Sequence, residues 1–325
     1  MKEYNVYDSY SPERKSKERK ELLFFSFMAS AAVIGYFIIS KVYAEAVKAL
    51  GLGRLITGTH LANESFSLVI TVIAIIVPFF VAAFFEKKRT NFELLPLDKP
   101  ENSLLMLLAV PAGVSVCIAG SLITNYISLL FSFSGITLSQ PSVASPTSGY
   151  ELFIYFIRLT VTAALIEEIC FRGIIMQPLR KYGNMFAVVA SSFVFAMMHC
   201  NLVQAPSAFI SAIGIGYFTI VTGTLWTGIL IHFINNLIVA VTQYVLSVSG
   251  EEAGLELSDI LTVIALCIGA VSLMVIYLMR KSVKFENTEK SVLTVKEKFK
   301  AYYLSIPMII AVLIIIYLMR AFITL

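Results

Sequence analysis

Long apolar runs, separated by short polar stretches, dominate the chain from Leu22 to its last residue. Several runs reach the roughly 20 residues that a helix needs to cross a bilayer. The pattern predicts nine membrane-spanning helices, with eight as the alternative if one of the short runs is re-entrant. The predicted spans are about 22–42, 66–86, 103–131, 152–175, 184–200, 206–222, 226–248, 259–279 and 302–322.

Composition agrees with this pattern. Of the 325 residues, 58% are hydrophobic and 14% are charged, whereas soluble domains carry about a quarter charged residues. A soluble globule is therefore excluded, and the fold class is an all-α, polytopic transmembrane helix bundle. The cysteines form no CxxC pair, so neither a disulfide framework nor a cysteine zinc site is indicated. They are Cys117, Cys170, Cys200 and Cys267.

Basic residues alternate between the two sides of the predicted bundle. Lys and Arg are frequent in the segments that would face inward if the N-terminus is cytoplasmic: 14–20, 87–89, 180–181 and 280–300. Of the segments that would face outward, the first holds Lys48 and Arg54, and 132–150, 201–205 and 249–258 hold none. Because cytoplasmic loops carry the excess of Lys and Arg, we expect a cytoplasmic N-terminus and a multi-pass protein of the cell membrane.

The apolar runs and the polar stretches between them divide the chain into four parts. These are a cytoplasmic tail (1–21), N-terminal transmembrane helices (22–147), a core (148–248), and C-terminal helices (249–325) with a basic cytoplasmic segment at 280–300. The Ser- and Pro-rich loop 132–150 is expected to be irregular. Segment 281–300 is expected to form a helix on the membrane surface before the last span.

Ionisable residues inside spans cost roughly 2.5–3.5 kcal/mol each on insertion, so they are candidates for function. The chain concentrates them, with two of its three histidines, in the core part: Arg158, Glu167, Glu168, Arg172, His199 and His232, joined by Asn235 and Asn236. The third histidine, His60, falls in a predicted outer loop. Arg158 is expected to be structural, either reaching outward or pairing with Glu151.

Spacing refines this set. Glu168 and Arg172 are four residues apart and share a helix face, whereas Glu167 lies about 100° around the helix and is left unpaired. His232 and Asn236 are also four apart, so they can address one bound group. Two histidines with an unpaired carboxylate are a common set for activating water, directly or on a metal.

Three motifs then occur in order on separate predicted helices: EExxxR from Glu167 to Arg172, FxxxH from Phe195 to His199, and HxxxN from His232 to Asn236. Together with the lead-in Thr222–Trp226, they resemble the CPBP family, the CAAX proteases and bacteriocin-processing intramembrane proteases. The resemblance covers about residues 148–245.

The resemblance implies a membrane-embedded endopeptidase. By motif position, Glu167 and His199 would activate water, and His232 with Asn236 would stabilise the oxyanion. Glu168 and Arg172 would support the site. The family is described both as metal-dependent, which would make Glu167, His199 and His232 zinc ligands, and as metal-free. The expected partners are membrane lipid and membrane-associated or hydrophobic peptides, and no nucleic-acid motif is present.

Other interpretations remain open at this point. Glu168–Arg172 is also a plausible structural ion pair, either histidine alone could serve helix–helix packing, and Asn235 could replace Asn236. Straight, full-length helices would also separate His199 from His232 in depth. At the level of function, the alternatives are a non-proteolytic family member with an immunity or scaffold role and, with less support, a transporter.

Overall fold

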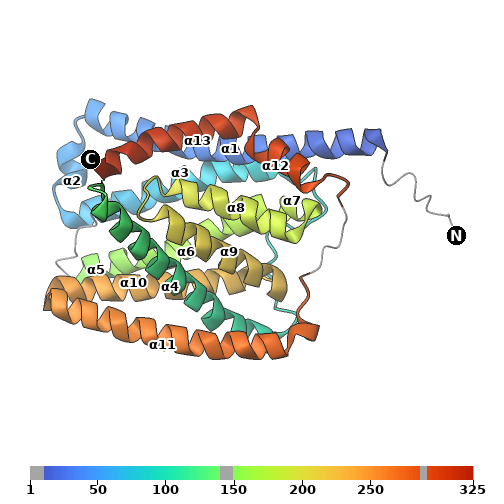
Figure 1. The fold of residues 1–325 in the computed structure, drawn as a ribbon. Helices are drawn as coiled ribbons and strands as arrows, with labels where there is room; N and C mark the ends of the chain where they lie inside the picture. Colours follow the sequence, from blue (N-terminus) through green and yellow to red (C-terminus); the bar gives the residue numbers. More distant parts are fainter. Residues whose placement is uncertain (1–10, 140–148, 286–290, 325) are drawn as a thin grey trace.

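The computed structural model describes residues 11–139, 149–285 and 291–324, and within them it is a bundle of helices (Figure 1). The α-helices are α1 Pro12–Ala49, α2 Gly53–Thr57, α3 His60–Glu86, α4 Ser103–Phe133, α5 Gly149–Phe156, α6 Ala163–Glu168, α7 Met176–Leu179, α8 Asn184–Met198, α9 Ala205–Thr222, α10 Leu225–Ser249, α11 Glu251–Leu278, α12 Val295–Tyr303 and α13 Ile306–Met319. Two π-helices, η2 Ile157–Thr162 and η3 Ile169–Ile175, flank α6, and 3₁₀ turns lie at η4 Arg180–Tyr182, η5 Arg280–Ser282 and η6 Arg320–Phe322. Two short strands, β1 Thr137–Leu138 and β2 Ile323–Thr324, complete the described elements.

The protein is an integral, multi-pass membrane protein. In the described residues, six helices are long and apolar enough to cross a membrane, or seven if the pair α12–α13, bent by 62°, counts as one span. The predicted count of nine, or eight, is not confirmed. One reason is α8, whose 15 residues give about 22 Å at 1.5 Å per residue, less than the roughly 30 Å hydrocarbon core. Another is the helical run from α5 to η4, which the two π-helices divide into short pieces.

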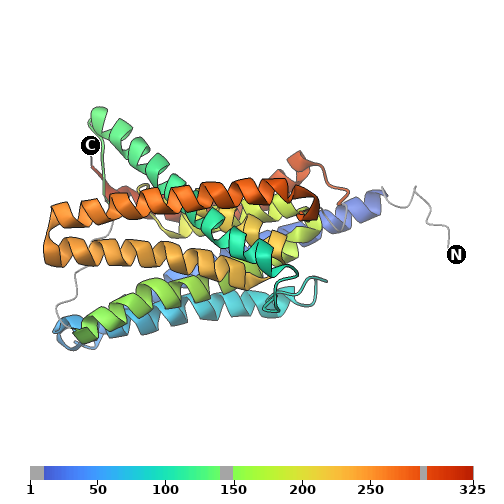
Figure 2. The same ribbon diagram turned by 90° about the horizontal axis from the view of Figure 1, so that it is seen from below.

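Two hydrophobic clusters build the interior. The first joins residues of α1, α3, η3, α8 and α13, and the second joins residues of α4, α9, α10 and α11. Helices α10 and α11 lie side by side, and α4 crosses them obliquely while packing on α9 (Figures 1 and 2). The run from α5 to η3 packs on α3 on one side and on α10 on the other. The segment that carries the glutamates therefore lies where the two halves of the bundle meet.

Side-chain caps set where several helices begin. The Ser11 hydroxyl accepts from Arg14 N, and the Asn102 side chain accepts from Leu105 N. Each satisfies an amide that has no partner within its own helix. Since α1 starts at Pro12, half of the segment predicted as a polar tail is helical. At 38 residues, or about 57 Å, this helix is longer than the membrane core is thick.

Two further segments bear on the sequence predictions. In 132–150, β1 pairs with β2 near the other end of the chain, in the register Thr137↔Thr324, which the sequence did not suggest, and 140–148 lies outside the described residues. In 281–300, α12 begins at a capping box of Thr294 and Glu297 just before α13, while 286–290 is again outside the described residues.

Candidate active site

Glu167 and Glu168 close α6, between the two π-helices η2 and η3. The wider turn of a π-helix redirects the side chains that follow it, and such turns are frequent at functional sites. Gly183, at φ +121°, then begins α8. This conformation suits glycine. After Gly183 the chain reverses direction, and α8 runs back along the helical segment that carries Glu167 and Glu168.

Glu168 is the central contact of the site. It is completely buried, and its Oε1 lies 3.0 Å from Arg172 Nη1 and 2.7 Å from His232 Nδ1. The Arg172 guanidinium, also fully buried, donates to Ala212 O at 3.3 Å and lies 4.7 Å from the centre of the Phe195 ring. The predicted pairing of Glu168 with Arg172 is confirmed. The contact with His232 was not predicted.

The second glutamate faces the same imidazole from its other nitrogen. An ionised carboxylate can only accept, so the proton in the short contact with Glu168 belongs to His232 Nδ1. His232 Nε2 then lies 3.9 Å from Glu167 Oε2, and the Glu167 side chain is 24% exposed. Glu167 takes no part in the ion pair with Arg172, as the spacing predicted.

His199 lies directly after α8, in a turn that is tightly fixed. Its Nδ1 is 3.1 Å from Phe195 O, and because a carbonyl only accepts, Nδ1 carries the proton and Nε2 keeps its lone pair. Cys200 adopts φ +54°, which costs about 1–2 kcal/mol for a residue with a Cβ. Asn201 holds the turn by donating to His199 O and to Gln204 Oε1, each at 2.9 Å.

The two histidines meet around one aromatic ring. The Phe195 ring centre is 5.0 Å from that of His199 and 5.9 Å from that of His232, both edge-on. Both imidazoles therefore contact the same ring, although straight, full-length helices would separate the two histidines. Helix α8 is too short to carry His199 across the membrane, so His199 ends within the bundle. Phe195 packs against both imidazoles.

Asn236 connects α10 to the first π-helix. Its Nδ2 donates to Leu159 O at 2.9 Å, and its Oδ1 accepts from Asn235 at 3.3 Å. An amide nitrogen has two N–H groups, so Asn236 retains one for another acceptor. Asn235 reaches Asn236 rather than the glutamate-bearing run.

One contributor could not be recognised in the sequence. A Cβ added to Gly228 of α10 would lie 2.6 Å from Thr219 Oγ1 and 3.1 Å from Glu168 Oε2, so only glycine lets α10 approach this closely. No motif marks this glycine.

Arg158 forms an ion pair, with a partner that the sequence did not suggest. Its Nε lies 2.7 Å from Glu64 Oε2 on α3. The histidine outside the core part, His60, is the first residue of that same helix rather than part of a loop.

With this geometry established, the comparisons with known proteins give one match. Residues 149–238 match the family model described as type II CAAX prenyl endopeptidase, Rce1-like. The chain carries an Rce1-like domain. The match runs from α5 into α10 and contains all three motifs, so the resemblance to the CPBP family is confirmed, and that family is one of proteases. No curated protein and no solved structure matches the chain.

The side chains of the Rce1-like domain do not fit a metal site as they are arranged. A catalytic zinc needs three protein ligands within about 2.3 Å of one point. Within 11–139, 149–285 and 291–324, no three His, Cys, Asp or Glu side chains are grouped so that they could hold an ion. Glu167, His199 and His232 therefore do not form the ligand set that the zinc alternative requires.

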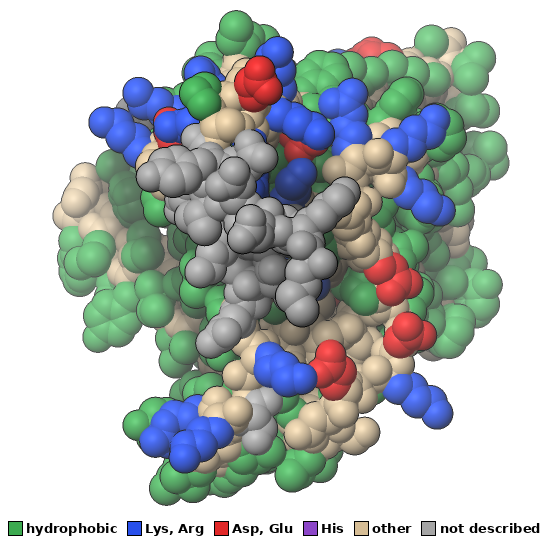
Figure 3. All heavy atoms as spheres, turned by 90° about the vertical axis from the view of Figure 1, so that its right-hand side faces the viewer, with side chains coloured by type: hydrophobic (Ala, Val, Ile, Leu, Met, Phe, Trp, Pro, Cys, Tyr) green, Lys and Arg blue, Asp and Glu red, His purple; other side chains and the backbone are tan. Residues whose placement is uncertain are grey.

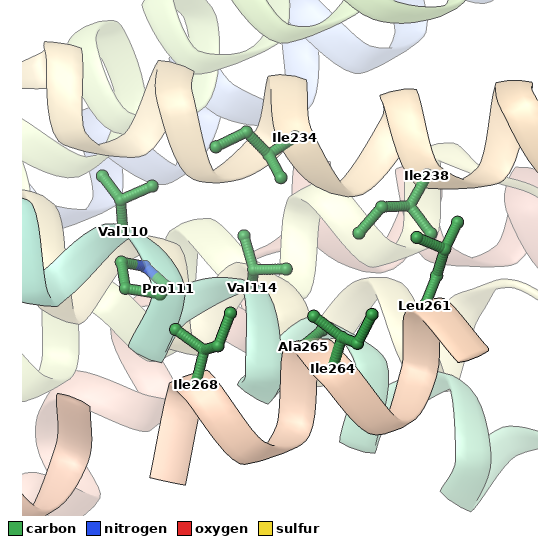
Figure 4. Close-up of a pocket in the computed structure, with 9 residues that line it drawn as sticks. All are labelled: Val110, Pro111, Val114, Ile234, Ile238, Leu261, Ile264, Ala265 and Ile268. Carbon is green, nitrogen blue, oxygen red and sulfur yellow. The ribbon is translucent and has the colours of Figure 1, made fainter. Parts of the chain in front are cut away.

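A cavity of about 260 Å³ lies at the edge of the Rce1-like domain, between α4, α10 and α11 (Figure 4). Figure 4 shows only aliphatic side chains and one proline around it, among them Val114, Ile234 and Ile264. With no polar group to act on a substrate, this cavity belongs to the packing of the bundle and not to the chemistry of the site.

Proposed function

We propose that this protein is an intramembrane endopeptidase that hydrolyses peptide bonds of membrane-associated or hydrophobic peptides. One observation carries the proposal: His232 lies between the buried, arginine-paired Glu168 and the partly exposed Glu167. The Glu168 carboxylate thus orients the His232 imidazole, and the Glu167 carboxylate is available for acid–base catalysis. A purely structural ion pair would explain Glu168 and Arg172 but leaves Glu167 without a reason.

In this proposal Glu167 is the general base. It takes a proton from water while the water oxygen attacks the carbonyl carbon of the scissile peptide bond. His199, with Nδ1 committed to Phe195 O, offers its Nε2 lone pair to orient the same water. When the C–N bond breaks, protonated Glu167 gives the proton to the leaving amine, so the enzyme returns to its starting state.

His232 and Asn236 are proposed to stabilise the negative charge on the oxygen of the tetrahedral intermediate. Nδ1 of His232 already donates to Glu168, so donation to the oxyanion must come from Nε2, and His232 must then be an imidazolium. The remaining N–H of Asn236 is the second donor. No step requires a metal, which makes this a proposal for a glutamate-type protease.

The proposal includes the orientation and the location. The charge asymmetry along the chain supports a cytoplasmic N-terminus in the cell membrane. In a chain freed of its four native cysteines, a membrane-impermeant thiol reagent applied to intact cells should label Glu251→Cys and should not label Lys281→Cys. The opposite labelling pattern would reverse the orientation.

The function is tested by comparing peptides in membranes that contain the wild-type protein, Glu167→Gln, or the control Glu251→Gln, whose glutamate is exposed at the start of α11. New peptide termini should appear with the wild type and the control and be missing with Glu167→Gln. If the three samples give the same termini, no cleavage depends on Glu167, and the proposed function fails.

A further inference from the structure

A basic pocket opens at the end of the bundle where α1 begins. It has a volume of about 300 Å³ and is lined by Lys17, Glu21, Lys88, Arg89, Asn91, Phe92 and Lys181. Three separate parts of the chain supply these residues: the first turns of α1, the segment after α3, and the turn before α8. Figure 3 shows this end of the molecule, where Lys and Arg side chains gather. Four cations thus face a single carboxylate.

Most of this charge has no counterion within residues 11–139, 149–285 and 291–324. Glu21 Oε2 lies 2.6 Å from Lys181 Nζ, whereas Lys17, Lys88 and Arg89 form no ion pair among the described residues. The acid nearest in sequence to Lys17, Glu18, is committed elsewhere.

Glu18 is committed to the segment before α12. It accepts from the Ser291 hydroxyl at 2.7 Å and from Val292 N at 3.0 Å, and it pairs with Arg14 at 3.2 Å. It therefore does not neutralise the pocket. Aromatic rings instead contact two of the cations: the Arg89 guanidinium lies 3.9 Å from the Phe24 ring centre, and Lys88 Nζ lies 5.4 Å from that of Phe84. Four cations with a single carboxylate among the described lining residues are suited to an anion such as a phosphate.

A second, larger pocket shares two lining residues, Asn91 and Phe92, with the basic one. Its volume is about 730 Å³. Its lining is mainly apolar, from Phe80, Ala83, Phe84, Leu94, Leu95 and Ile174, with Lys87, Thr90 and Glu93 as the further polar residues. Phe80 and Phe84 are 45% and 65% exposed on a candidate membrane span. Next to the basic pocket there is thus an apolar pocket that is accessible from the lipid.

We propose that the two pockets together bind one anionic phospholipid, with its phosphate in the basic pocket and an acyl chain in the apolar one. The pairing of an anion site with an apolar site fits an amphiphile better than a free anion. The unpaired cations exclude a lipid without net charge as the preferred ligand. Anionic lipids give the cytoplasmic leaflet its negative surface potential, so the proposal agrees with the cytoplasmic N-terminus proposed above, and it does not depend on proteolysis.

The bound lipid would also contact the support of the candidate active site. The segment that lines the apolar pocket continues to Pro96, whose carbonyl accepts from Leu225 N at 2.8 Å at the start of α10. Leu94 O lies so close to Gly173 that a Cβ there would approach it to 2.7 Å. An acyl chain against this segment would stabilise its contacts with η3 and α10, the elements that carry Arg172 and His232.

The test compares two double variants that remove the same charge from the same end of the molecule. Lys88→Gln/Arg89→Gln removes two cations of the basic pocket. Arg280→Gln/Lys281→Gln removes two adjacent cations after α11, where Arg280 lies over Tyr277 much as Lys88 lies over Phe84. Phosphatidylglycerol and phosphatidylcholine are titrated separately onto each delipidated protein in detergent, and native mass spectrometry counts the lipids that are retained.

We expect one tightly held phosphatidylglycerol on the wild type and on Arg280→Gln/Lys281→Gln, with weaker retention of phosphatidylcholine. Binding to Lys88→Gln/Arg89→Gln should be about 30-fold weaker, because each Lys or Arg beside an anionic lipid contributes roughly fivefold to affinity. Equal loss in both double variants, or equal retention of the two lipids, would overturn the proposal.

Two further arms test the parts of the site separately. Ala83→Trp, which fills the apolar pocket, should weaken phosphatidylglycerol binding with every cation in place, and Lys17→Gln should weaken it even if the double variant fails to fold. Glycerol 3-phosphate, which has no acyl chain, should not displace the lipid at equal concentration. Displacement by glycerol 3-phosphate, or unchanged binding to Ala83→Trp, would mean that the site binds phosphate alone, which contradicts the proposal.

Discussion

Replacing one or the other of the neighbouring glutamates should separate stability from catalysis. Among the described residues, Glu168→Gln leaves the fully buried Arg172 guanidinium with Ala212 O and the Phe195 ring as partners. Removing one member of a buried ion pair costs about 3–5 kcal/mol of unfolding free energy. Glu167→Gln removes no ion pair with arginine and lies on a partly exposed side chain. It should change stability by less than about 0.5 kcal/mol and lower the rate about 10²–10⁴-fold, since glutamine cannot take a proton.

The chain contains one tryptophan, Trp226, which donates from Nε1 to Leu97 O at 2.9 Å at the start of α10. Its fluorescence during titration with sodium dodecyl sulfate in mixed micelles therefore reports the unfolding of the helix that carries His232. Cleavage of a quenched fluorescent peptide gives the rate. The control is Glu168→Gln/Arg172→Met, which removes both charges and should be more stable than Glu168→Gln alone.

The reasoning fails if Glu168→Gln unfolds at the same detergent fraction as the wild type. It also fails if Glu167→Gln is the variant that loses stability. In either case Glu168 is not the carboxylate that neutralises Arg172. The roles given to Glu168, as the ion-pair partner, and to Glu167, as the general base, must then be exchanged or abandoned.

Three further results are expected. Chelators should leave peptide cleavage unchanged, and loss of activity that added zinc restores, at one ion per chain by elemental analysis, would show that Glu167, His199 and His232 rearrange into a metal site. His232→Ala and Asn236→Ala should each lower the cleavage rate about 10²–10³-fold, because each removes a donor to the oxyanion. Asn236→Ala should unfold at nearly the same detergent fraction as the wild type. Wild-type cleavage rates in these variants would contradict the oxyanion role. Gly228→Ala should destabilise the protein by about 1–3 kcal/mol, because its Cβ would lie 2.6 Å from Thr219 Oγ1 and 3.1 Å from Glu168 Oε2. Unchanged unfolding would refute the close approach of α10.

The sequence predicted those parts of the site that follow from local spacing. Glu168 and Arg172 are four apart on one helix, so their pairing needed no knowledge of the fold. The confirmed family resemblance likewise rests on short motifs. The contact between Glu168 and His232 spans 64 residues, and only the tertiary arrangement of α6 and α10 creates it. The same holds for Phe195, whose ring touches both histidines only because α8 ends early.

The span count shows a related limit of hydropathy. An apolar run of suitable length predicts a buried segment, but it does not distinguish burial in lipid from burial in protein, because both environments favour the same apolar composition. The run 152–175 is apolar enough for a span, but its two π-helices change the helix pitch around the glutamates. No residue in it is a proline that would mark such a break. The two π-helices interrupt the regular helix, and for this reason the run is missing from a count of regular spans. The same two π-helices flank Glu167 and Glu168, so the irregular part of this membrane helix is also the part that carries the candidate catalytic residues.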